Sequence, residues 1–288
     1  MAPTPRSLVL DLLATLPRGS MPVRALIEAA ALFGISDNAL RVALARLLAR
    51  GEVARDGHGR YRLGPRATAV AARVASWRRA GDRLRPWRGA WVAVHGPERG
   101  GARRAAGGSG ERALRLLGFR RLTRGLALRP DNLRQGVAAL RRELAELGLG
   151  GESLVFRIDE LDDDARERAL ALWDTARIRQ GYEAAQSRLE RSARRLATLP
   201  PAAAMVESFE IGGDVIRQIA SDPLLPDELV PRAEREALVA AMRAYDRLGR
   251  ACWRAFLRRH DVVPPSAPFQ LRVGERKADA RPTAEVAP

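Results

Sequence analysis

The segment "GISDNALRVALARLLARGEVARDGHGRYRL", residues 34–63, constrains the fold of this chain more than any other. Ser36 is a natural helix N-cap, because its hydroxyl can accept a hydrogen bond from a free N–H of the first turn. The helix is predicted to run to about Arg50 and to end at Gly51, since glycine readily takes the left-handed conformation of a helix C-terminus. Two short strands are predicted next, on either side of the tight-turn sequence 56–59.

The predicted helix has two different faces. With 3.6 residues per turn, its leucines fall within roughly a quarter of the circumference and predict a buried stripe, made of Leu40, Leu44, Leu47 and Leu48. The opposite face carries small or polar side chains between two arginines: Asn38, Arg41, Val42, Ala45 and Arg46. Small side chains let a helix approach a groove closely, arginine reaches phosphates or guanine edges, and asparagine pairs with adenine. This face therefore predicts contact with DNA.

Two further helical patterns precede this segment, "RSLVLDLLATL" and "MPVRALIEAAALFG", the second with Pro22 in its first turn. Three helices followed by a basic hairpin are typical of a winged helix-turn-helix, whose third helix enters the major groove while the wing lies along the backbone or minor groove. The predicted DNA-binding residues are Ser36, Asn38, Arg41, Val42, Ala45, Arg46, His58 and Arg60. A winged helix used for protein contacts is the alternative at this point.

The distribution of charge favours the same kind of partner. The chain has a net charge of +16, and residues 1–90 contain 16 basic and six acidic side chains, a net charge of +10. Residues 91–150 have a net charge of +7, whereas residues 151–262 have a net charge of −2. A basic region confined to one half of a chain is the expected footprint of a polyanion.

The middle of the chain predicts a second domain. Its patterns are a strand "GAWVAVHG", a helix "ERALRLLG", two strands around Arg124-Gly125, a helix "LRQGVAALRRELAELG" and a strand "SLVFRI". This β-α-β-β-α-β order is that of a ferredoxin-like domain. The predicted fold is therefore multidomain, mainly α with α+β.

Five segments follow from these patterns. They are a winged helix-turn-helix domain (1–66), a basic linker helix (67–88), a ferredoxin-like domain (89–160), a helical C-terminal domain (161–262) and a disordered tail rich in Pro, Ala and charge (263–288). Trp77 and Trp87 of the linker are predicted to anchor it to a neighbouring core.

No familiar catalytic or metal-binding pattern is present. The three histidines lie far apart, at positions 58, 95 and 260, and the single cysteine, Cys252, excludes an internal disulfide framework and a multi-cysteine zinc site. We therefore expect no enzymatic activity, no metal and no cofactor. No apolar run is long enough for a membrane span, and the N-terminus is a poor secretory signal, so a cytoplasmic protein is expected.

These features resemble the PaaX-like family of bacterial transcriptional repressors, known for controlling phenylacetate catabolism. The matching stretches are "LFGISDNALRVALARLLARGEV", "YRLGP" and "LGFRRLTRGLALRPDNL", and the resemblance extends over about residues 6–260. It implies the same three modules, with a middle domain similar to that of the CRISPR adaptation nucleases. It also implies a homodimer that binds double-stranded DNA at a palindromic operator and is released by an aryl-CoA thioester, typically phenylacetyl-CoA.

Two alternatives remain at this level. A nucleic-acid-processing enzyme would use the middle domain, but the related nucleases have an acidic residue at the end of the first strand, where this chain reads "WVAVHGP" with His95. Asp131 lies near another strand end without an evident acidic partner. A DNA-binding protein without a small-molecule ligand is the second alternative. The sequence does not locate an effector site.

Overall fold

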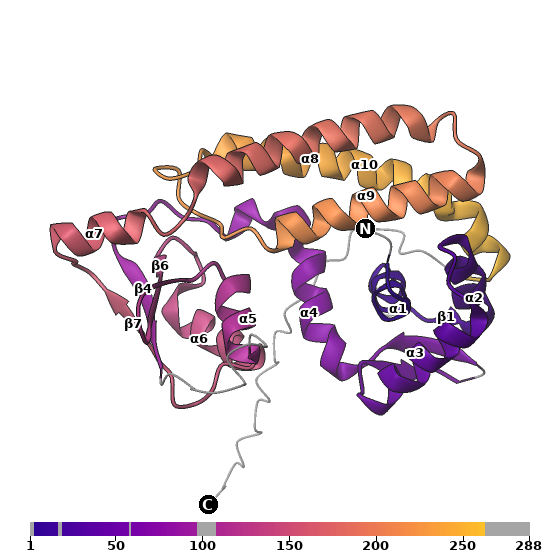
Figure 1. Ribbon diagram of the computed structural model, residues 1–288, viewed down its shortest axis with the longest axis horizontal. Coiled ribbons are helices and arrows are strands. Elements are labelled where there is room, and N and C mark those ends of the chain that lie inside the picture. Colours follow the sequence, from indigo (N-terminus) through magenta and orange to yellow (C-terminus); the bar gives the residue numbers. More distant parts are fainter. Residues whose placement is uncertain (1–2, 17–18, 58, 97–107, 263–288) are drawn as a thin grey trace, which may run out of the picture.

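The computed structural model describes residues 3–16, 19–57, 59–96 and 108–262. Within these residues the chain is a mixed helical and sheet structure of several units, with two small antiparallel sheets. Three long helices form one layer along the molecule, and the two sheet-bearing units lie below opposite ends of that layer (Figure 1). Both His58 and the predicted disordered tail, 263–288, lie outside the described residues.

The N-terminal unit begins with three helices. They are α1 (Pro5–Ala14), α2 (Val23–Leu32) and α3 (Asp37–Ala49), and the strands β2 (Val53–Arg55) and β3 (Arg60–Leu63) follow. A short strand β1 (Met21–Pro22) pairs with β3, which gives the sheet order β1-β3-β2. The prediction that Pro22 lies in the first turn of a helix is therefore wrong. Its backbone is extended, with ψ of 145°, and it is the N-cap residue of α2.

The ends of α3 agree with the prediction. The Ser36 hydroxyl accepts a hydrogen bond from the Ala39 N–H over 3.3 Å, and Gly51 has a φ of +66°. Leu40, Leu44 and Leu47 are buried, but Leu48 is only half-buried. At 100° per residue, Leu48 lies roughly 80° around the helix from Leu40, at the margin of the stripe.

The hydrophobic core of the N-terminal unit includes side chains from two of the long helices. Met205 of α9 (Pro201–Ala220) and Trp253 and Phe256 of α10 (Arg232–Arg259) belong to the same buried cluster as the leucines of α1 and α3. An ion pair between Glu28 of α2 and Arg259, 2.8 Å long, lies at the edge of this contact. The unit is therefore packed directly on the long helices.

An α-helix and two short 3₁₀ helices join the N-terminal unit to the middle unit. These elements are α4 (Pro65–Ala75), η1 (Ser76–Arg79) and η2 (Gly81–Arg83). Trp77 is buried in the core of the middle and helical units, and the half-buried Trp87 packs against the same core. The prediction that both tryptophans anchor this connection is confirmed.

The middle unit is a four-stranded sheet with two helices. Its elements are β4 (Trp91–His95), α5 (Ser109–Leu116), β5 (Arg120–Thr123), β6 (Leu126–Pro130), α6 (Gly136–Glu146) and β7 (Leu154–Ile158). The strands are antiparallel in the order β5-β6-β4-β7, so that β4 is central. The first four residues of β4 are all buried, which explains the uninterrupted apolar run "WVAV".

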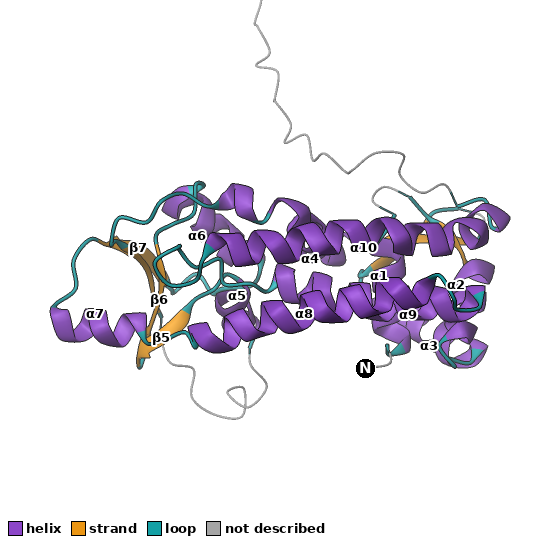
Figure 2. Ribbon diagram, turned by 90° about the horizontal axis from the view of Figure 1, so that it is seen from above, coloured by secondary structure: helices purple, strands orange, loops and turns teal. Residues whose placement is uncertain are grey.

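The last unit is helical, as predicted. It consists of α7 (Asp163–Leu170), α8 (Thr175–Leu196), α9 and α10. The last three lie side by side (Figure 2). The acidic run 162–164 begins α7: Asp162 accepts a hydrogen bond from the Ala165 N–H over 2.7 Å, and the two carboxylates that follow complement the helix dipole. Four residues, 171–174, separate α7 from α8.

Candidate nucleic-acid interface

The outer face of α3 is exposed along its length. Asn38, Arg41, Val42, Ala45 and Arg46 are all exposed, directly opposite the buried leucines. Val42 is 42% exposed and is one of five large apolar side chains that are exposed among the described residues. In Figure 1, α3 lies on the side of the N-terminal unit that faces away from the α8–α10 layer. The structure thus brings five of the predicted residues onto one accessible helix face.

The two arginines of this face differ in their surroundings. Arg41 pairs with Asp37 one turn earlier, with 2.6 Å between Nε and Oδ1, and both side chains are more than half exposed. Exposed pairs at this spacing contribute only about 0.3–0.5 kcal/mol, so a phosphate or a base edge can replace Asp37 at little cost. Arg46 makes no ion pair with another described residue.

Ser36 lies at the N-terminal end of the same face. Its oxygen is occupied as the cap of α3, but the hydroxyl proton remains able to donate. The free N–H groups of a first helical turn favour anions, so this end of α3 suits a DNA phosphate.

The hairpin holds the remaining predicted residues. Asp56 N–H donates to the Arg60 carbonyl over 2.9 Å, and Gly57 and Gly59 have φ values of +57° and +73°, which explains the two glycines of the turn. The Arg60 guanidinium donates to the Ser20 hydroxyl over 2.9 Å and to the Ser20 carbonyl over 2.7 Å. Arg60 therefore fastens the hairpin to the segment before β1.

Two other arginines of the hairpin are more accessible than Arg60. Arg55 and Arg62 are exposed and form no ion pair with a described residue. The sequence signal for them was their place in alternating strands on either side of the turn. The prediction chose His58 and Arg60 instead. The local pattern does not show that Arg60 is already bonded to Ser20, which lies 40 residues away along the chain.

The acidic residue considered for a nuclease reaction has other partners. Asp131 is buried and pairs with Arg85 over 2.8 Å and with Arg157 over 3.3 Å. His95 is exposed at the end of β4. In the described part of the chain, no three His, Cys, Asp or Glu side chains are grouped so that they share a metal ion. The carboxylate of Asp131, which a nuclease site would need, is thus already paired with two guanidinium groups.

Comparisons with known proteins found one family model and a similar solved structure. Residues 4–67 match the family model described as PaaX-like protein. An uncharacterized protein, Rv0674 from Mycobacterium tuberculosis, is similar in structure, with a TM-score of 0.54 and 26% identity over 90% of this chain and 97% of that chain. No curated protein matches significantly. None of the described helices is both long and apolar enough to span a bilayer. The N-terminal segment of this chain, residues 4–67, is thus similar to the PaaX-like family, in agreement with the resemblance seen in the sequence.

Proposed function

We propose that the protein is a DNA-binding transcriptional repressor of the PaaX type. The observation that carries the proposal is the exposed face of α3, where Asn38, Arg41 and Arg46 surround small side chains on a helix whose other face is buried. In this proposal, α1–α3 and the β2–β3 hairpin are a winged helix-turn-helix, and α3 enters the major groove. The match of residues 4–67 to the PaaX-like family supports it.

Each residue of this interface has a proposed role. Asn38 and Arg41 contact base edges, while Ser36 and Arg46 contact phosphates. Val42 and Ala45 allow close approach, and the wing lies along the backbone or the minor groove, with His58 and Arg60 as its predicted contacts. Arg55 and Arg62 join them, because their guanidinium groups are exposed.

The other units have supporting roles. The β-α-β-β-α-β order and the strand order β5-β6-β4-β7 support a ferredoxin-like middle domain.

From the family resemblance we propose a cytoplasmic homodimer on a palindromic operator, since a two-fold operator suits a two-fold dimer. We propose that it controls the catabolism of aromatic acids such as phenylacetate and catalyses no reaction itself.

An aryl-CoA thioester, with phenylacetyl-CoA as the first compound to test, is the proposed effector. Release from DNA requires only that the effector binds more tightly to a dimer geometry whose two recognition helices do not match successive major grooves. No covalent change is needed.

Fluorescence anisotropy tests the proposal. Purified protein is titrated onto DNA from upstream of its own gene and onto a random duplex at the same salt concentration, and phenylacetyl-CoA is then added. We expect specific binding that is lost with the thioester, and a cost of about 1–3 kcal/mol for Arg41→Ala on the specific DNA. Arg166→Ala, in the exposed part of α7, is the matched control.

Three results would contradict parts of the proposal. Equal affinity for upstream and random DNA would exclude sequence-specific recognition by α3. Specific binding that ignores phenylacetyl-CoA would leave a repressor but exclude this effector. Equal weakening of both duplexes by Arg41→Ala would assign Arg41 to a phosphate rather than to a base.

A further inference from the structure

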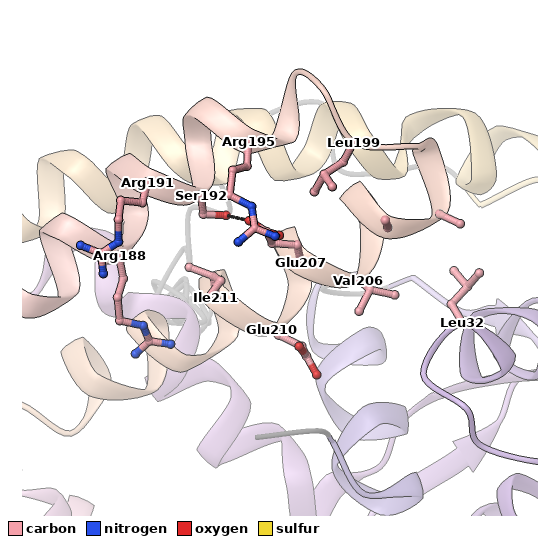
Figure 3. A pocket seen from close by; sticks show the side chains of 12 residues that line it. Leu32, Arg188, Arg191, Ser192, Arg195, Leu199, Val206, Glu207, Glu210 and Ile211 are labelled. Carbon is pink, nitrogen blue, oxygen red and sulfur yellow. Dashed lines mark hydrogen bonds and ion pairs between the residues drawn. The ribbon is translucent and has the colours of Figure 1, made fainter.

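A cavity of about 670 Å³ lies between α8 and α9, and Leu32, the last residue of α2, forms part of its wall. Its size is within the range of about 300–1,000 Å³ that is usual for small-molecule sites. Figure 3 shows that its two ends differ: Arg188 and Arg191 lie at one end, and Leu199, Val206 and Leu32 at the other. The cavity is therefore cationic at one end and apolar at the other.

The apolar end is formed by side chains that have no polar atoms. Leu199, Val206 and Leu32 are half-buried there, and Ala202 and Ala203 of the first turn of α9 add small exposed surfaces. A hydrocarbon group placed against them would remove apolar surface from water, which favours binding.

The middle of the cavity is rigidly built. Burial raises the pKa of Tyr245 to about 12, so its hydroxyl stays protonated and donates to Ser192 Oγ over 2.7 Å. Ser192 in turn donates to Glu207 Oε1 over 2.7 Å, and Glu207 pairs with Arg195 over 3.0 Å. This chain of hydrogen bonds fixes the position of Glu207 before any ligand arrives.

The cationic end has one arginine that is not neutralised by a described carboxylate. Arg188 pairs with Asp214 over 3.0 Å, whereas Arg191 is exposed and makes no ion pair with a described residue. Glu210 also lines the cavity without such a pair and would repel an anion placed beside it. These charges direct an anionic group to the Arg188–Arg191 end.

We propose that this cavity binds a small amphipathic anion, with its anionic group at Arg191 and Arg188 and its apolar body against Leu199 and Val206. The anionic group is a carboxylate or a phosphate, both of which accept hydrogen bonds from guanidinium. The purpose of the site rests on the proposed function, because the ligand would be the effector of the repressor. Leu32 extends the cavity to α2, the helix before α3, so a ligand there contacts both the long helices and the DNA-facing unit.

Isothermal titration calorimetry in the absence of DNA tests the site. The probes are octanoate, octyl phosphate and, as the neutral control of equal chain length, octanol. We expect at least one of the two anions to bind and octanol to bind at least tenfold more weakly. Whichever anion binds more tightly identifies the ligand as a carboxylate or a phosphate.

Four variants locate the binding. Arg191→Gln is expected to weaken anion binding roughly tenfold, which is the usual effect of one charge-assisted hydrogen bond. Arg194→Gln changes an exposed arginine of the same helix outside the cavity and should have no effect. Glu210→Gln should tighten binding, since it removes the repulsion. Ala203→Trp, at an exposed position of the wall, should fill the cavity and abolish binding.

The inference is overturned if neither anion binds, if octanol binds as tightly as the anions, or if Arg191→Gln and Ala203→Trp leave binding unchanged. These results do not depend on the repressor hypothesis. Anion binding at this site by a protein without specific DNA affinity would sustain the site and refute the proposed function. Specific DNA affinity without anion binding would do the reverse.

Discussion

The side-chain amide of Asn132 donates a hydrogen bond to the main-chain carbonyl of Leu224 over 2.8 Å, and both residues are buried. Asn132 Oδ1 accepts a hydrogen bond from the guanidinium of Arg129, which also donates to the Pro223 carbonyl. Burial lowers the pKa of Arg129 to about 9, with the charges of Arg83 and Arg73 acting in the same direction. These contacts fasten the middle unit to the loop between α9 and α10.

Asn132→Ala should destabilise the protein by about 1–3 kcal/mol, because it leaves the buried Leu224 carbonyl without its donor. Chemical denaturation followed by tryptophan fluorescence would measure the change. Arg134→Ala, at an exposed position two residues later, is the control and should have little effect. Equal stability of the Asn132 variant and the wild type would show that the contact contributes nothing.

Gly118→Ala should be more damaging than the same change at Gly136. Both glycines have positive φ, +80° and +70°. A Cβ at residue 118 would lie 2.5 Å from the Pro223 carbonyl oxygen, whereas at residue 136 it would meet nothing within 4 Å. We expect about 1–2 kcal/mol for Gly136→Ala from conformation alone, and roughly 3 kcal/mol or more for Gly118→Ala. Similar thermal midpoints for the two variants would contradict this.

Glu143 should make the stability of the protein depend on acidity. Burial alone would raise the pKa of Glu143, but the charges of Arg83 and Arg73 and a hydrogen bond from Gln135 outweigh it and hold the pKa below its ordinary value of 4.5. A lowered pKa contributes stability that is fully present above pH 4.5 and is lost as the pH falls through the folded-state pKa. Glu143→Gln should therefore lower stability at pH 7 and flatten the decline below pH 4.5.

Urea denaturation at several pH values between 7 and 3 would measure this dependence. Glu146→Gln, in the exposed last turn of the same helix, is the control. An acid decline as steep in Glu143→Gln as in the wild type would assign the dependence to other carboxylates.

How far sequence alone could go depends on the range of the interactions. The cap at Ser36 and the glycine at Gly51 are decided within one helical turn, and both were predicted correctly. A helical C-terminal domain was predicted over 161–262, but the break between α7 and α8 was not located, although Asp174 caps α8 as Asp162 caps α7. Local signals thus located most elements but not every boundary.

Contacts between distant segments were beyond such reasoning. The partner of Arg60 is Ser20, and Glu28 contacts both Arg259 and His260 at the other end of the described chain. The cavity between α8 and α9 exists only because two helices and the end of a third converge. A pattern within one segment contains no information about such neighbours.

Arg60→Met should reduce stability as well as any affinity for DNA. Its two hydrogen bonds to Ser20 join the hairpin to the segment before β1, so their loss should cost about 1–2 kcal/mol. A double-mutant cycle with Ser20→Ala would measure the coupling, which we expect to exceed about 0.5 kcal/mol. Unchanged stability with weaker DNA binding would indicate that Arg60 serves the DNA alone.

Arg46→Ala should weaken binding to specific and random DNA alike, since we assign it to a phosphate. Removing one phosphate contact should reduce the slope of log affinity against log salt by about 1. Anisotropy titrations at three or more salt concentrations would give that slope, with Arg166→Ala as the control. A loss restricted to the specific duplex would instead assign Arg46 to a base.

The packing of Trp253 and Phe256 into the core of the N-terminal unit has a consequence for synthesis. The N-terminal unit is synthesised before α10, whose side chains complete its core. Until α10 has been made, this core lacks Trp253 and Phe256. The unit proposed to recognise DNA therefore completes its core only after α8 and α9, the helices on either side of the cavity, have been made.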